Sequence, residues 1–126
     1  MNRMTVLYDA DHAACVEVRW WLARQPAYVE LDFLPGASPL AGRRFPMVPG
    51  PRLTVVADDG AVYRGDDAYV MCLWALVEHR ETALHLSAPA RRRFARQVVE
   101  SLAAAKGRTF TLTDTMLERM NEASPP

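Results

Sequence analysis

The pattern of apolar and polar positions in the first third of the chain predicts a strand, a helix and a second strand. Residues 5–8 (Thr-Val-Leu-Tyr) are mostly of the types that strands favour. From Ala13 to Arg24 apolar residues recur at helical spacing, Asp11 is placed to cap the helix start, and Pro26 closes the helix. Residues 29–34 then alternate apolar with acidic side chains, which is typical of a strand.

The middle of the chain predicts a loop and a hairpin. Residues 36–51 are rich in Gly and Pro, so we expect a long loop with at most a short helix. Residues 53–57 and 61–63 are of strand-favouring types, and the turn Asp58-Asp59-Gly60 stands between them. Because Asp-Gly supplies the positive backbone angle that a tight turn requires, these residues predict a β-hairpin.

Two segments beyond the hairpin predict helices. Residues 68–77 are apolar, and their Ala, Met, Leu and Trp content favours a buried helix over a strand. Residues 89–105 predict a last helix that is basic in its first half. The order is therefore β-α-β, a loop, a β-hairpin and α, which predicts an α/β sheet covered by helices. We expect one domain over residues 1–112 and a frayed tail over residues 113–126.

Three tryptophans and Cys72 lie in apolar parts of the predicted helices. Trp20 and Trp21 lie within the apolar stripe of the first helix, and Trp74 lies within the apolar run of a later one. We expect all three tryptophans to be core residues and not a ligand cage. Cys72 belongs to the same run as Trp74 and is also expected in the core.

Composition narrows the classes of partner. The chain has 126 residues, 15 basic and 15 acidic, so no overall charge draws it to nucleic acid or to an anionic membrane. Residues 1–12 lack the apolar stretch of a secretory signal, and the longest apolar run is too short to span a bilayer. Two cysteines are too few for a disulfide scaffold. We expect a soluble cytoplasmic protein with no membrane or nucleic-acid partner. The oligomeric state stays open.

The junction between the first strand and the first helix, residues 8–15, is where we expect chemistry. The first amides of a helix have no partners within the helix, and the helix dipole favours negative charge at that end. A cysteine thiolate is such a charge, and Cys15 lies at this junction. No cofactor is indicated by the residues.

The same junction resembles the DCC family of thiol-disulfide oxidoreductases. That family opens with a strand and Tyr-Asp-Gly-x-Cys-x-x-Cys at a helix start, and later carries a hairpin followed by Tyr-Arg-Gly-x-x-Ala. Here residues 6–9 match the opening, residues 58–68 match the second segment, and Cys15 stands at the second cysteine. The resemblance covers about residues 5–77. It implies a thioredoxin-like fold with an extra C-terminal helix, and a protein thiol, a disulfide or a small thiol as partner.

One residue departs from the family pattern. The first cysteine of the pair is replaced by His12, so the motif reads Asp9-x-x-His12-x-x-Cys15. Exchange between a dithiol and a disulfide needs two sulfurs, one to attack and one to resolve the mixed disulfide. Only the inner sulfur is present, and in this fold that position is usually shielded. The resemblance therefore implies at most single-thiol chemistry at Cys15.

Several roles stay open for the three candidate catalytic residues. Cys15 is either a small buried core residue or a thiol held as thiolate by His12, which lies three positions earlier and shares a helix face. His12 is otherwise a helix-start residue with no role. Asp9 is either a turn residue that binds local amides or the proton acceptor of the thiol. A metal held by His12 and Cys15, with Asp9 or Asp11, is less favoured because it has few ligands.

Two function classes follow from these alternatives. The first is an oxidoreductase relative with single-thiol chemistry at Cys15. The second is a catalytically silent thioredoxin-like binding module for a protein or small-molecule partner. Such a module would present the His12 loop, Pro51, which is a candidate cis proline, and the basic residues 91–96.

Overall fold

A computed structural model describes residues 1–46 and 52–105. The described elements form a mixed α/β fold, as the hydrophobic pattern predicts. In chain order they are β1 (Arg3–Tyr8), α1 (Ala13–Ala23), β2 (Glu30–Pro35), α2 (Pro39–Arg44), β3 (Leu53–Ala57), β4 (Val62–Arg64), α3 (Asp66–Ala75), α4 (Arg80–Leu86), a 3₁₀ turn (Arg92–Phe94) and α5 (Ala95–Ala104). Pro51 and the expected tail over residues 113–126 lie outside the described residues.

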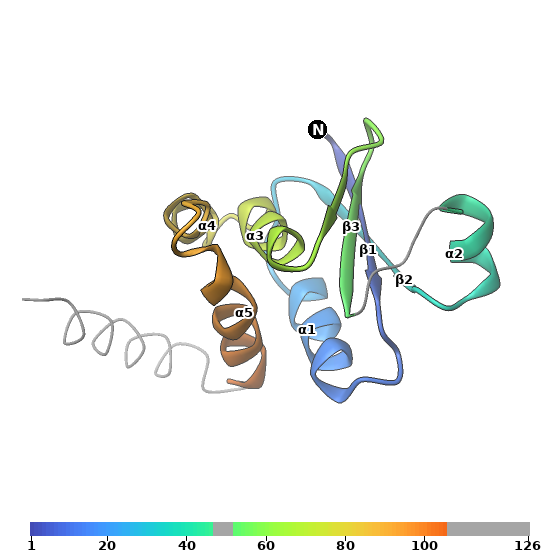
Figure 1. Cartoon of the computed structure of the whole chain (residues 1–126), viewed down its shortest axis with the longest axis horizontal. Coiled ribbons are helices and arrows are strands. Elements are labelled where there is room, and N and C mark those ends of the chain that lie inside the picture. Colours follow the sequence, from blue (N-terminus) through green and yellow to red (C-terminus); the bar gives the residue numbers. More distant parts are fainter. Residues whose placement is uncertain (47–51, 106–126) are drawn as a thin grey trace, which may run out of the picture.

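The four strands form one mixed sheet in the order β2-β1-β3-β4 (Figure 1). β1 runs parallel to β2 and antiparallel to β3, and β3 pairs antiparallel with β4. At the end of β1, Tyr8 lies opposite Leu53, the first residue of β3. This register brings the turn that follows β1 next to the residue that precedes β3.

Helices cover the sheet unequally. Figure 1 shows α1, α3 and α5 on one side of the sheet and α2 on the other. Successive side chains of a strand point to opposite faces, so Met4 and Val6 of β1 enter the large core while Leu7 joins a small cluster with Ala41 and Val56. None of the helices in residues 1–46 and 52–105 is both long and apolar enough to cross a membrane.

The hairpin predicted for the middle segment is confirmed. The predicted hairpin is β3 and β4, with Gly60 at a φ of 92° in the turn and the Asp59 carboxylate accepting a hydrogen bond from the Ala61 amide. The described part of the expected loop, residues 36–46, contains one six-residue helix, α2. Ser38 caps it, because its hydroxyl accepts a hydrogen bond from the Ala41 amide at 3.2 Å.

Two predictions about the first helix are wrong. Asp11 does not cap α1, because His12 occupies the N-cap position and the Asp9 carboxylate accepts the Asp11 amide at 2.9 Å. This bond places Asp11 in the turn, ahead of the helix. Trp20 is not a core residue, since 55% of its surface is exposed, while Trp21 is buried as predicted.

The C-terminal helices also differ from the prediction. The helix expected over residues 89–105 begins only at Ala95, because the amides of Arg91 and Arg92 both donate to the Ala88 carbonyl and the chain turns there. The run 68–77 ends its helix at Ala75, since Leu76 is extended and pairs with Ala27. The seven-residue helix α4 was not predicted.

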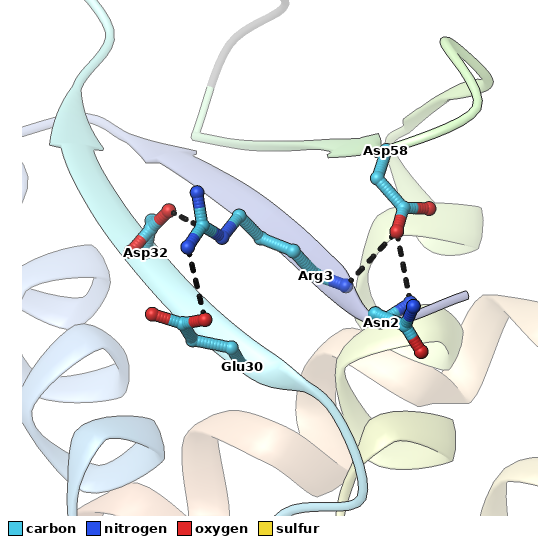
Figure 2. A network of polar contacts seen from close by, with 5 residues as sticks. All are labelled: Asn2, Arg3, Glu30, Asp32 and Asp58. Carbon is cyan, nitrogen blue, oxygen red and sulfur yellow. Dashed lines mark hydrogen bonds and ion pairs between the residues drawn. The ribbon is translucent and has the colours of Figure 1, made fainter.

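A polar network ties the start of β1 to both of its neighbours (Figure 2). The Asp58 carboxylate accepts hydrogen bonds from the backbone amides of Asn2 at 2.9 Å and Arg3 at 3.2 Å. The Arg3 guanidinium pairs with Glu30 at 3.0 Å and with Asp32 at 3.5 Å. The network fixes the end of the sheet that lies away from the β1–α1 turn.

This network predicts a pH dependence of stability. The amide of Asn2 is the main cause that lowers the pKa of Asp58 below its ordinary value. A carboxyl whose pKa falls on folding contributes stability above its unfolded pKa of ~3.9, and this is lost as the pH falls through the folded value. We expect the unfolding midpoint of Asp58→Asn to fall less than that of the parent between about pH 5 and pH 3, with Asp11→Asn as the control. Equal acid sensitivity in urea titrations would contradict this assignment.

Candidate functional site

The turn between β1 and α1 is organised by Asp9. Its amide donates to the Arg52 carbonyl at 3.0 Å, and its carbonyl accepts the His12 amide at 3.2 Å. Its carboxylate accepts the Asp11 amide at 2.9 Å. Asp9 therefore performs the local role of a turn residue, and its action as a proton acceptor stays a prediction.

His12 lies at the start of α1 with its ring half-buried. Its backbone is extended, with φ of −106° and ψ of 115°, and its side chain forms no capping bond to the described part of the helix. The ring atom Nδ1 is buried and has no hydrogen-bond partner among the described residues. The structure brings His12 and Cys15 into one helical turn, but it does not join them through this atom.

Cys15 is the third residue of α1 and has 0% of its surface exposed. Burial raises the pKa of this thiol above its ordinary value, and the charges of Asp9 and Glu100 act in the same direction. The Asp9 amide and the Arg52 guanidinium oppose this by favouring the thiolate. Cys15 is thus a buried thiol whose pKa is affected by several charged groups.

Cys72 of α3 provides a contrast within the same core. It is fully buried, and burial alone raises its pKa to about 12. Both thiols are free. Because charged groups act on Cys15 and only burial acts on Cys72, the two sulfurs have different electrostatic surroundings. The expectation that Cys72 is a core residue is confirmed.

Tyr69 of α3 is a second polar group near Cys15. Only 2% of its surface is exposed, and its hydroxyl has no hydrogen-bond partner within residues 1–46 and 52–105. Burial raises the pKa of Tyr69, and negative charge on Cys15 and on Glu100 raises it further. The phenol therefore stays protonated and can donate a hydrogen bond.

Arg52 and Glu100 complete the site, and the motif comparison did not assign either of them. Arg52 precedes β3 and has a φ of 68°, a backbone conformation that costs energy in any residue with a side chain. Its Nη1 atom lies 3.6 Å from Oε2 of Glu100 on α5. The residues are far apart in the sequence, so no local pattern signals their pairing.

Two arginines of the predicted basic surface contact residues outside this site. In the basic stretch 91–96, Arg92 pairs with Asp67 at 3.1 Å and Arg91 donates to the His85 carbonyl at 3.1 Å, so both hold neighbouring elements. Pro51 lies outside the described residues. Over residues 1–46 and 52–105, no three His, Cys, Asp or Glu side chains gather closely enough to hold a metal ion.

Two cavities offer binding surfaces. The first, of about 620 Å³, lies beside the His12 loop along the outer side of α1 and is lined by Ala10, Asp11, Ala13, Val16, Glu17, Trp20 and Arg24. The second, of about 460 Å³, lies over the sheet beside Phe45, with Thr5, Val56 and Val62 among its lining residues. Both volumes fall within the range of small-molecule sites. Neither cavity could be predicted from a sequence pattern. The first lies along an exposed face of α1, and the second combines residues from separate elements.

Comparison with known proteins leaves the family open. No protein-family model matches this chain, and no curated protein and no solved structure matches it. The resemblance to the DCC family therefore stays a prediction that rests on the quoted residues of the β1–α1 junction and the hairpin.

Proposed function

We propose that this chain is a thioredoxin-like relative of the DCC thiol-disulfide oxidoreductases that cannot exchange dithiols and retains at most the chemistry of one thiol, Cys15. One observation carries the proposal. Of the two thiols, only Cys15 lies at the strand-to-helix junction among charged groups, whereas Cys72 lies where burial alone acts on it.

The arrangement of elements supports the thioredoxin-like part of the proposal. A β-α-β unit with parallel strands is followed by an antiparallel hairpin and a helix, which is the order that the resemblance implies. The junction after β1 then faces the residue before β3, through the bond from the Asp9 amide to the Arg52 carbonyl. In this arrangement Cys15 occupies the inner sulfur position and His12 the outer one.

The chemistry available to one thiol is limited. A Cys15 thiolate that attacks a disulfide forms a mixed disulfide and releases the second sulfur as a thiolate. The outer position holds His12, so no second sulfur stands there to resolve that mixed disulfide. A small external thiol must attack it to restore Cys15, which makes the reaction depend on that thiol.

Burial restricts this chemistry further. The raised pKa of Cys15 keeps most of the sulfur protonated near neutral pH, and the thiolate is the nucleophile. The sulfur also has no exposed surface, so a reagent reaches it only when the start of α1 opens locally. We therefore expect slow reactions with small thiols and disulfides.

The second candidate function is the catalytically silent binding module. The complete burial of Cys15 favours it, and so does the cavity beside the His12 loop, where Trp20 is exposed. Tryptophan is enriched among residues that dominate binding energy at interfaces. In this candidate Cys15 is a packing residue, and a partner contacts the outer side of α1.

Alkylation of single-thiol variants separates the two candidates. Cys72→Ala leaves Cys15 alone, and Cys15→Ala leaves Cys72 as the matched control. We expect native Cys15 to react with iodoacetamide at pH 8 at least about ten times faster than native Cys72, whose pKa is higher. Because burial raises the pKa of Cys15, its rate should still rise above pH 9, beyond the ordinary thiol value of ~8.5. A Cys15 that reacts only in denaturant leaves the binding module as the function.

A further inference from the structure

Polar side chains from four separate parts of the chain interact electrostatically with Cys15. Asp9 in the β1–α1 turn, Arg52 before β3 and Glu100 on α5 affect the pKa of Cys15, and Cys15 in turn affects the pKa of Tyr69 on α3. Among these four, Arg52 and Glu100 form an ion pair at 3.6 Å. The Arg52 carbonyl also accepts the amide of Asp9, which lies in the turn that leads to Cys15, at 3.0 Å. The pair joins the strand side of the site to α5, the helix that packs against α1.

Three features of this cluster are costly for the fold. The Tyr69 hydroxyl and Oε2 of Glu100 are buried without a hydrogen-bond partner in the described part of the chain, although Oε2 faces the Arg52 guanidinium. Buried polar groups are normally hydrogen-bonded, so each exception calls for an explanation. Arg52 also adopts a positive φ. Strained backbone and perturbed titratable groups concentrate at functional sites, and here all three residues interact electrostatically with Cys15.

We propose that the Arg52–Glu100 ion pair controls the reactivity of Cys15, with Glu100 suppressing its thiolate and Arg52 favouring it. Both are positioning residues that act through the charge they place beside the sulfur. The inference rests on the proposed single-thiol chemistry of Cys15, and it adds the groups that set how often that thiol is ionised.

The two members of the pair act in opposite directions. Without the Glu100 carboxylate, the Arg52 cation stands alone beside Cys15 and stabilises the thiolate, so the pKa of Cys15 falls. Without the Arg52 cation, the Glu100 carboxylate is unpaired and repels the thiolate, so the pKa of Cys15 rises. Arg52 and Glu100 are partly exposed, with 38% and 26% of their side-chain surfaces accessible, so solvent reduces both effects.

A purely structural pair would behave differently. If the ion pair only held β3 and α5 together, either substitution would loosen the packing over α1. Cys15 would then be reached more often in both variants, and both would react faster. Opposite effects of the two substitutions therefore distinguish electrostatic control from loss of packing.

The test uses Glu100→Gln and Arg52→Gln in the full-length Cys72→Ala protein. We expect Glu100→Gln to alkylate at pH 8 about three to ten times faster than its parent, and Arg52→Gln to alkylate slower by a similar factor, as pKa shifts of about half a unit to one unit imply. Arg52→Lys keeps the charge and should stay close to the parent. Arg92→Gln breaks the ion pair with Asp67, which does not act on Cys15, and is the matched control.

A second measurement does not depend on access to the sulfur. The chemical shift of ¹³Cβ in labelled Cys15, followed against pH, reports its ionisation directly in each variant. Shifts of the apparent pKa in opposite directions support the inference, and shifts in the same direction or no shifts overturn it. If these pKa values move as expected while native Cys15 resists alkylation, the ion pair controls the thiol but the proposed single-thiol chemistry fails.

Discussion

The oxidised His12→Cys variant is expected to carry a disulfide between the introduced cysteine and Cys15. His12 is the N-cap of α1 and Cys15 is its third residue, so the two positions lie one turn apart. Side chains three residues apart on a helix share a face, and Cys-x-x-Cys pairs at helix starts form disulfides in this way. The new sulfur would replace a ring whose Nδ1 atom has no partner in the described structure, so no hydrogen bond of that atom is lost.

The introduced sulfur should be the more reactive of the two. It would stand at a half-buried position at the helix start, where the N-cap side chain makes no capping bond, whereas Cys15 is fully buried. Unpaired amides and the helix dipole stabilise a thiolate there. We therefore expect the variant to reduce a disulfide substrate in a coupled assay that the parent fails.

Peptide mapping of the oxidised variant checks this geometry. Ala13→Cys is the matched control, because residues two apart on a helix do not face each other and its new thiol should form no bridge with Cys15. If oxidised His12→Cys shows no bridge between position 12 and Cys15, the geometry inferred for the junction is wrong. The thioredoxin-like assignment would then lose its main support.

The parts of the fold that were predicted correctly have local causes. The hairpin follows from an Asp-Gly turn, and Gly60 does adopt a positive φ there. The span of α1 follows from the spacing of apolar residues and the nearby Pro26. In both cases the residues that determine the structure are neighbours in the sequence.

The parts that were missed have distant causes. The positive φ of Arg52 occurs in a residue type that gives no signal for it, and its partner Glu100 belongs to the last helix. The short helix α4 buries only Ala83 and Leu86, so its apolar pattern is too brief to detect. Sequence reasoning therefore found the sulfur and its turn, but it missed the ion pair and the phenol that act on them.

The start of α1 shows how a local signal fails when two candidates compete. Both Asp9 and Asp11 are residue types that bond to nearby amides. The Asp9 amide is already held by the Arg52 carbonyl, which fixes the turn one step earlier and leaves the Asp9 carboxylate to accept the Asp11 amide. A contact between the residue after β1 and the residue before β3 therefore decides which carboxylate organises the turn.

The two adjacent tryptophans of α1 provide the prediction with the largest expected effect on stability. Both fit the apolar stripe of the helix, but only 1% of Trp21 is exposed, against 55% of Trp20. Trp21 packs in the core that holds α1 against the sheet. Replacing a buried tryptophan by alanine removes its transfer free energy and leaves a cavity, so we expect Trp21→Ala to lower the free energy of unfolding by about 3–5 kcal/mol.

Trp20→Ala is the matched control for this prediction, because it removes the same side chain from the preceding position of the same helix. Its main loss is the contact with the Arg19 guanidinium, which lies 4.1 Å from the centre of the Trp20 ring, and an exposed contact of this kind contributes about 0.5–1 kcal/mol. Urea denaturation followed by circular dichroism measures both variants. Trp21→Phe keeps an aromatic ring and should lose less than Trp21→Ala, so a graded loss is measurable even if the alanine variant does not fold. Equal losses in Trp20→Ala and Trp21→Ala would mean that α1 is rotated about its axis, and Cys15 would then no longer face the core.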